Sequence, residues 1–289
     1  MKLFLAILFG LSAAFAGAQI PDVQVKADLG PTFRNETGGG SDVHWYDPFG
    51  RHSTVALLFA LEPGFRAYIS QKIERIRHDA DPSQIDESYV EDAGVWRAGK
   101  QYLPFGQGRV LRESVLAVRS DTELFLRELP MTVAACDAGS GRQRGIVGRI
   151  GRSLGVSFAL GQHFGIAGTS MTQARLPDEG PGIGEGYGKV IGIDASRKAG
   201  PLLLSGEFVL FRSGSNNSED RDFLDLTATL QPTMTRSLTL GYSLATHPGI
   251  RSLRLQGSFL ATDNVWVEPW VRTRNGHMFD TGVSVRVRL

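Results

Sequence analysis

The sequence is short of cysteine, of net charge and of long apolar runs. Among its 289 residues there is one cysteine, Cys136, so no disulfide can form within the chain. Basic residues number 31 and acidic residues 30, a balance that argues against nucleic acid as a partner. Beyond Phe15, no stretch is long and apolar enough for a membrane-spanning helix, which needs about 20 residues.

The one marked apolar run lies at the start of the sequence. Residues 1–18 carry a single charge at Lys2, continue with an apolar stretch and end in small residues. This pattern predicts a secretory signal peptide cleaved before Gln19, followed by a single domain over residues 19–289. A retained membrane helix is the alternative, although the run is short for one. An exported chain without a disulfide needs a large core or a closed sheet for stability.

From residue 221 onward, apolar and polar side chains alternate in several successive stretches. The apolar positions are Leu224, Leu226, Ala228, Leu230, Leu238, Leu240, Tyr242, Leu244, Leu253, Leu255, Phe259, Val283, Val285, Val287 and Leu289. The positions between them carry hydroxyl, amide or charged groups. A period of two over about ten residues, broken by polar turns, predicts antiparallel strands with one apolar and one polar face.

The length of these stretches indicates where the apolar face points. Strands of soluble proteins have about five or six residues, whereas a tilted membrane-spanning strand needs about nine to eleven. The stretches approach the longer value, and their polar face carries charge in mid-strand at Asp225, Arg254, Glu268 and Arg286. The mean hydropathy is only -0.11 although 42% of residues are hydrophobic, as expected when two opposed faces cancel.

Connections between the stretches alternate in length along the whole chain. Short turns are predicted at 62–64, 198–201, 231–235 and 261–264, and longer loops near 36–52, 104–128, 165–186 and 212–221. Short turns on one rim and long loops on the other are typical of outer-membrane barrels. We therefore predict an all-β fold, a transmembrane antiparallel β-barrel of about 14 strands, within a range of about 12 to 16.

Two segments in the first half of the chain resemble a known family. Residues 98–106 read AGKQYLPFG, and residues 121–130 read DTELFLRELP. They resemble the strand and the following inward loop of bacterial outer-membrane porins of the phosphate-selective type and of the related siderophore-associated porins. The resemblance implies that the corner formed by Pro104, Phe105 and Gly106 leads into a loop, residues 104–129, that folds into the barrel.

The resemblance also implies which side chains narrow the pore. Lys100 matches the basic position on the strand, and Arg109, Arg112 and Arg119 fall in the inward loop, where basic residues favour anions. No residues match the arginine ladder of the phosphate channels, so phosphate selectivity is not implied. The alternation adds further candidates for the pore lining on the polar face: Arg254, Glu268, Arg272, Arg286 and Arg288.

Two tryptophans share the parity of this charged face. Trp266 and Trp270 alternate with Val265, Val267 and Val271. They could form part of an aromatic girdle at the membrane surface, stack inside the pore, or pack in the core of a sandwich.

Motifs for catalysis and for cofactor binding are lacking. The glycines before Lys189 do not have the spacing of a phosphate-binding loop. The six histidines are scattered, with no pair at metal-ligand spacing, and no G-x-S-x-G nucleophile motif occurs. We predict that the chain is not an enzyme and that it holds neither cofactor nor metal.

Together these patterns predict a porin-like channel for passive diffusion of small polar or anionic solutes across the bacterial outer membrane. The predicted partners are these solutes, outer-membrane lipid and further copies of the chain in a homotrimer. Two alternatives stay open. One is a non-conducting barrel with a structural or adhesive role, and the other is a secreted, soluble β-sandwich that binds a carbohydrate or a partner.

Overall fold

The computed structural model describes residues 22–36, 43–47, 53–73, 85–112, 114–124, 128–137, 144–164, 187–212, 220–246 and 249–289. The predicted signal peptide lies outside these ranges. Within them, every regular element is a β-strand, and no helix is long and apolar enough to cross a membrane.

The strands are β1 (Asp22–Leu29), β2 (Thr32–Glu36), β3 (Val43–Asp47), β4 (Thr54–Glu62), β5 (Phe65–Lys72), β6 (Ile85–Asp92), β7 (Trp96–Tyr102), β8 (Ser114–Leu124), β9 (Leu129–Asp137), β10 (Arg144–Gly151), β11 (Leu154–Phe164), β12 (Tyr187–Ala199), β13 (Leu202–Arg212), β14 (Arg221–Thr233), β15 (Arg236–Ala245), β16 (Ile250–Thr262), β17 (Val265–Arg274) and β18 (His277–Arg288). Each pairs with its neighbours in antiparallel fashion, and from β4 to β18 the neighbours are consecutive in the chain.

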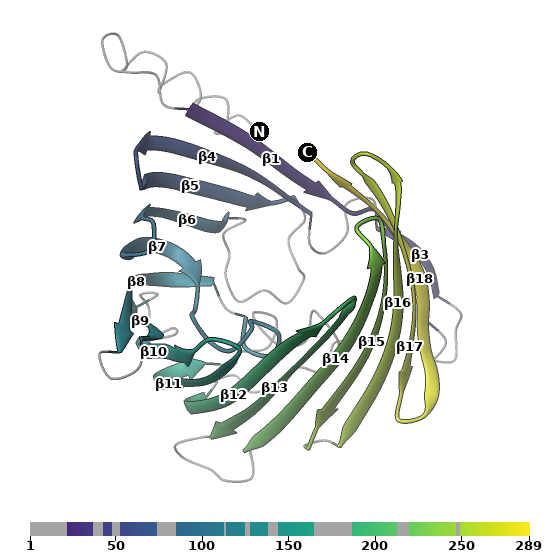
Figure 1. The fold of residues 1–289 in the computed structure, drawn as a ribbon. Coiled ribbons are helices and arrows are strands. Elements are labelled where there is room, and N and C mark those ends of the chain that lie inside the picture. The colour runs from purple at the N-terminus through teal and green to yellow at the C-terminus, as the bar shows by residue number, and fades with distance from the viewer. Residues whose placement is uncertain are drawn as a thin grey trace.

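The sheet closes on itself through β1, which pairs with β4 on one side and with the end of β18 on the other (Figure 1). β2 continues β1 along β18 after an interruption at Gly30 and Pro31, since proline cannot donate to the ladder. In the same way, β3 pairs with β2 and β4 pairs with β1, so β3 and β4 follow each other along the interrupted strand formed by β1 and β2. With β1 and β2 counted as one interrupted strand and β3 and β4 as another, the 18 segments make a closed barrel of 16 strands.

The number of strands is therefore at the upper limit of the predicted range, and the missed strand is β8. The prediction assigned residues 104–129 to one inward loop, whereas residues 114–124 form β8. The described residues before β8 that leave the sheet are 103–112, here called the inward segment. Alternation is weak in β8 because its lumen-facing residues Val115 and Ala117 are also apolar and belong to the same buried cluster as Leu111 of the inward segment. Residues 36–52, predicted as a loop, contain β3.

The predicted short turns are confirmed on one rim of the barrel. The chain reverses within a few residues between β4 and β5, β12 and β13, β14 and β15, and β16 and β17. Residues 165–186 and 213–219, which connect strands at the opposite rim, lie outside the described residues. The strands from β10 to β18 have 8 to 13 residues, a length that suits a tilted strand across a bilayer.

The apolar face of the sheet points outward, as predicted. Large apolar side chains of the outer face remain exposed, such as Leu226 at 43%, Leu240 at 47% and Leu253 at 45%. Their neighbours Asp225 and Ser252 point inward and are buried. A sandwich would bury these leucines between two sheets, so the alternative of a soluble β-sandwich is wrong for this single closed sheet.

Candidate functional site

The inner side of the barrel, here called the lumen, is where polar and charged side chains converge. The inward segment enters it after β7 and lies against the inner wall (Figure 1). Its apolar side chains Leu103, Phe105, Val110 and Leu111 are at most 5% exposed. They form one buried cluster with inward-facing residues of β8 to β16, so the hydrophobic core of this protein lies inside the barrel.

Glycine on the wall makes room for the corner of the inward segment. A side chain at Gly192 of β12 would place its Cβ 2.8 Å from the ring of Phe105. At Gly106 the backbone has φ +52°, which favours glycine, and a Cβ there would overlap the carboxylate of Glu207. The Pro-Phe-Gly corner is thus the point at which the chain turns onto the wall.

Polar groups of β11 to β13 fix this corner. The carboxylate of Glu207, 1% exposed, accepts hydrogen bonds from the backbone N–H groups of Gln107 (3.3 Å) and Arg109 (3.2 Å). The hydroxyl of Ser157 accepts one from the N–H of Gly106 at 2.9 Å. The side-chain amide of Gln107 donates to the carbonyl oxygen of Ala195 at 2.9 Å. Both backbone donors reach Oε2 of Glu207, whereas Oε1 is buried and has no hydrogen-bond partner among the described residues.

Around the corner, carboxylates and arginines are paired. The guanidinium of Arg109 bonds the hydroxyl of Thr227 and lies 3.6 Å from a carboxylate oxygen of Asp225. Arg149 of β10 binds Asp194 of β12 through two nitrogens, with the Nε contact at 3.0 Å. We call the lumen-facing side of β8 to β14, which the inward segment packs against, the covered wall.

The side of the lumen formed by β16, β17, β18, β1 and β2 has a different character. Its lumen-facing positions include five arginines, here called the arginine wall: Arg34, Arg254, Arg272, Arg286 and Arg288. Three carboxylates accompany them: Asp28, Glu268 and Asp280. The set therefore has a formal charge of +2, five positive groups against three negative ones.

The ion pairs of the arginine wall join neighbouring strands. Asp280 of β18 is 1% exposed and lies between Arg34 (Nε to Oδ2, 2.9 Å) and Arg272, whose Nε donates to Oδ1 at 3.0 Å. Arg286 of β18 bonds Asp28 of β1. These pairs bind β17, β18, β1 and β2 together at the point where the barrel closes.

The structure places most predicted pore-lining residues on the lumen side. Arg254, Glu268, Arg272, Arg286 and Arg288 all share lumen-facing register positions. Trp266 and Trp270 share them too, which excludes a position on the lipid-facing surface. The guanidinium carbon of Arg288 lies 5.6 Å from the ring centroid of Trp266, and that of Arg254 lies 5.9 Å from the ring centroid of Trp270.

The basic residues predicted for the inward loop separate into two groups. Arg109 and Arg112 lie in the inward segment, and the guanidinium carbon of Arg112 is 4.7 Å from the ring centroid of Tyr102. Arg119 belongs to β8, where it faces the lumen and its Nε donates to Asp121 at 3.0 Å.

Lys100 does not line the lumen, contrary to the prediction. It is opposite Leu116 in the register of β7 and β8, and Leu116 is 56% exposed on the outer face. The next residue, Gln101, faces inward, is fully buried and donates to the carbonyl oxygen of Ala117 at 2.9 Å. The resemblance matched the residue type but did not fix its parity in the strand.

Several lumen-facing residues escaped the sequence analysis. Glu207 could have been identified from the sequence, because it is the single acidic residue in the otherwise mostly apolar stretch LLLSGEFVLF. Arg34 and Asp280 carried no signal of their own, because only the closure of the barrel brings β2 against β18. Within the described ranges, no three histidine, cysteine or acidic side chains are grouped so that they could hold a metal ion.

No protein-family model matches the sequence, and no curated protein matches it. Solved structures do. The anion-selective porin from Comamonas acidovorans aligns with a TM-score of 0.61 and 15% identity over 93% of this chain and 99% of the porin. OmpT of Vibrio cholerae with loop L8 deleted aligns with a TM-score of 0.60 and 11% identity over 94% of this chain and 100% of OmpT. OmpF of Salmonella typhi in complex with daunomycin aligns with a TM-score of 0.59 and 10% identity over 93% of this chain and 98% of OmpF.

At these identities the similarity is one of fold. It covers nearly the whole length of both chains in each case, including the closed sheet. The chain has the fold of the outer-membrane porins, a closed antiparallel barrel of 16 strands.

Proposed function

We propose that the protein is a passive diffusion channel for small polar solutes, with a preference for anions, in the bacterial outer membrane. The observation that carries this proposal is the division of the sheet into two faces. Exposed leucines, valines and phenylalanines cover the outer face, and charged side chains cover the lumen. Such a sheet suits hydrocarbon outside and water inside, and the inward segment narrows the bore.

The excess of arginine in the lumen supports the preference for anions. The arginine wall and its three carboxylates together have a formal charge of +2, and fixed positive charge in a narrow bore concentrates anions and repels cations. One of the similar structures is described as an anion-selective porin. The pore-lining residues that we propose are Arg109, Arg112, Arg119, Arg254, Glu268, Arg272, Arg286 and Arg288. The finer assignment to the phosphate-selective and siderophore-associated porins stays a prediction from the sequence.

Conductance and reversal potential in planar bilayers test the proposal. The purified protein should form stable current steps, and in a KCl gradient the reversal potential should shift toward the equilibrium potential of chloride. Arg288→Glu should lower the chloride preference, most clearly at low salt, where charges are least screened. Arg251→Glu is the matched control, because Arg251 is exposed on the outer face of β16 and should change selectivity little.

Two results would overturn the proposal. A heat-modifiable, folded protein that never opens a conductance would favour a non-conducting barrel with a structural or adhesive role. A reversal potential equal in wild type and in Arg288→Glu would remove the role given to the arginine wall.

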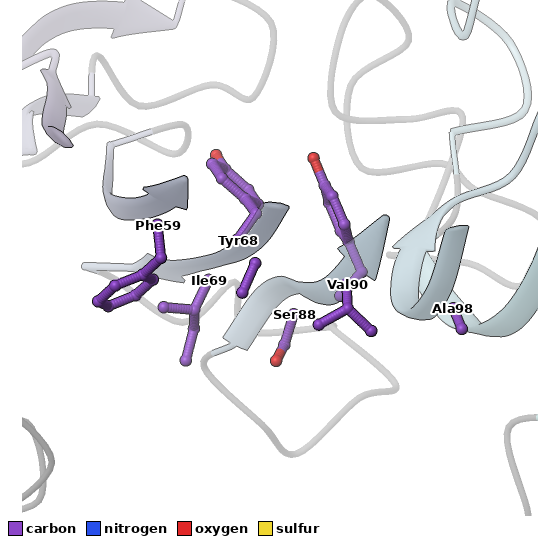
Figure 2. Close-up of a pocket in the computed structure, with 8 residues that line it drawn as sticks. Phe59, Tyr68, Ile69, Ser88, Val90 and Ala98 are labelled. Carbon is purple, nitrogen blue, oxygen red and sulfur yellow. The ribbon is translucent and has the colours of Figure 1, made fainter. Parts of the chain in front are cut away.

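We further propose that three copies associate through the outer face of β4 to β7. A depression there has small side chains, Ala67, Ser88 and Ala98, at its floor, between Phe59 and Val90. In Figure 2, Tyr68 points to one side of the sheet and Phe59, Ile69, Ser88 and Val90 to the other. One similar structure, OmpT of Vibrio cholerae, is described as a trimer form.

The outward pair Ser88 and Lys100 supports protein rather than lipid on this face, because a charged group facing hydrocarbon is costly. Ala98→Trp should fill the depression and give monomers when the mass of the detergent-solubilised protein is measured by light scattering. Ala228→Trp, on the outer face of β14, is the control and should leave the oligomer unchanged. A monomeric wild-type protein would contradict the proposal.

A further inference from the structure

Trp270 lies at the centre of the arginine wall. In the register of the sheet it is opposite Gln256 of β16 and Gly282 of β18. Its side chain is half-buried, so part of the indole is open to the lumen. The guanidinium carbon of Arg254, also half-buried, lies 5.9 Å from the ring centroid. The bore therefore presents an aromatic surface beside a cation.

Gly282 provides the space for this ring. A Cβ at Gly282 would overlap Cζ2 of Trp270 and would also lie 2.5 Å from the backbone carbonyl oxygen of Phe33 on β2. The backbone of Gly282 is outside the left-handed region, so this glycine is not required by its own conformation. The indole reaches across β18 because no side chain stands in its way. Such a cradle holds the ring in one position, and a fixed ring binds with less loss of entropy than a mobile one.

Positive charge surrounds the ring on two sides. Arg34 is opposite Gly282 in the register. Arg254 and Arg272 are opposite each other at the next lumen-facing position after the pair of Gln256 and Trp270. One carboxylate, Asp280, pairs with both Arg34 and Arg272. Glu268 also faces the lumen, two residues before Trp270 on β17, so three guanidinium groups against two carboxylates leave a formal charge of +1 around the indole.

The same combination is repeated on β17. Trp266 is four residues from Trp270, which corresponds to about 13 Å along a strand. The guanidinium carbon of Arg288 lies 5.6 Å from its ring centroid, and Arg286 is opposite it in the register. Two tryptophans with arginines therefore follow each other along the axis of the bore.

From these contacts we infer that the arginine wall is a binding site for planar aromatic carboxylates, which pass from Trp270 to Trp266. The inference rests on the proposed channel function and names its solute class. An aromatic ring stacks on an indole face, and a carboxylate accepts two parallel hydrogen bonds from a guanidinium. A neutral sugar lacks the charge, and a saturated ring lacks the flat face. Passage requires weak binding at successive sites, which two matched sites provide.

Competition between benzoate and chloride in planar bilayers tests the inference. Benzoate should reduce the chloride current of the full-length protein, with half-block at about 1 to 10 mM, an affinity appropriate to a permeating solute. Cyclohexanecarboxylate has the same charge but a saturated ring, so it should need about a five-fold higher concentration. Glucose should not block. Trp270→Leu should raise the half-blocking concentration of benzoate about five-fold and leave that of cyclohexanecarboxylate unchanged.

Two further variants separate the site from general effects. Gly282→Ala keeps the tryptophan but places a methyl group against its ring and against the backbone carbonyl oxygen of Phe33 on β2. If heat-modifiable migration shows that the barrel still closes, this variant should weaken benzoate block as Trp270→Leu does. Trp96→Leu removes an outward-facing tryptophan of β7 and should change nothing. Conductance in KCl and heat-modifiable migration show that each variant is folded. Equal block by benzoate and cyclohexanecarboxylate, or block that is unchanged in Trp270→Leu, would overturn the inference.

A protein without conductance would overturn the channel but not the site. In that case, quenching of tryptophan fluorescence by 4-nitrobenzoate in detergent micelles tests whether the binding site exists. Saturable quenching that is lost when Trp266 and Trp270 are both replaced by leucine, and kept in Trp96→Leu, supports the binding site. Quenching that is linear in concentration and equal in both variants overturns it.

Discussion

The covered wall and the arginine wall belong to one sheet but use their inward positions in different ways. On the covered wall, Val147, Val209 and Phe211 are fully buried against the inward segment, and Glu207 accepts two hydrogen bonds from that segment's backbone. On the arginine wall, guanidinium groups pair with carboxylates of adjacent strands, and Trp270 stays partly open. One wall holds a loop in place, and the other remains available to solutes.

The largest expected effect on the free energy of unfolding comes from replacing Asp280, whose carboxylate pairs with both Arg34 and Arg272. Asp280→Asn removes the negative charge of a nearly fully buried ion-pair set and leaves two like charges together. We expect a loss of about 3 to 5 kcal/mol of unfolding free energy, measured by urea unfolding in lipid vesicles. Asp137→Asn is the control, because Asp137 and Arg144 are both more than half exposed, and should cost at most about 1 kcal/mol.

Phe105→Ala tests the apolar anchor of the covered wall. Phe105 is 1% exposed against Gly192, and its truncation should cost about 3 kcal/mol. Because the inward segment loses its main apolar contact, the single-channel conductance should also rise. Phe105→Leu keeps much of the volume and should show a smaller change of both quantities. A wild-type conductance in Phe105→Ala would mean that this side chain does not hold the segment.

Glu207→Ala tests the polar anchor at the same corner. It removes the acceptor of the Gln107 and Arg109 N–H groups and leaves both donors without their carboxylate. We expect a loss of about 2 kcal/mol, together with noisier current from a less well fixed segment. Glu207→Gln retains a carbonyl acceptor and should fall between wild type and Glu207→Ala. Equal stability of all three proteins would contradict this account.

The smallest expected effect on the free energy of unfolding comes from two glycine substitutions, which separate the cost of backbone strain from the cost of a side-chain clash. Gly106 and Gly200 have similar left-handed conformations, with φ of +52° and +56°. Alanine at Gly200 meets no atom within 4 Å and should cost about 1 kcal/mol from the backbone alone. Alanine at Gly106 meets the carboxylate of Glu207 as well, so its cost should be greater. The difference in urea unfolding measures the contact, and equal costs would show that the carboxylate moves aside freely.

The sequence was most informative where one face of a strand meets hydrocarbon and the other meets water. The alternation of Leu226, Leu240 and Leu253 with polar residues predicted both the strands from β14 to β18 and the outward direction of their apolar face. The positions of the arginine wall other than Arg34 followed from the same parity. A period of two is a reliable signal there because the two environments differ strongly.

The covered wall was less predictable for the same physical reason. Where the inward segment packs on the lumen side, as at Val115 and Ala117, both faces of the strand are apolar and the alternation disappears. Contacts between distant strands were also beyond the sequence. The pairing of Arg34 with Asp280 depends on ring closure, and the cradle of Trp270 depends on which residue β18 places opposite it.

The seam between β1 and β18 has a consequence for how the barrel folds. Ala27 and Leu289 exchange two backbone hydrogen bonds, at 3.0 Å and 2.9 Å, across a separation of more than 250 residues. Contacts so distant in the chain form slowly, because much conformational freedom is lost before they are gained. An unclosed sheet would leave two unpaired edges in hydrocarbon, which is strongly unfavourable. Insertion and closure are therefore expected to occur together, as a late and cooperative event of assembly.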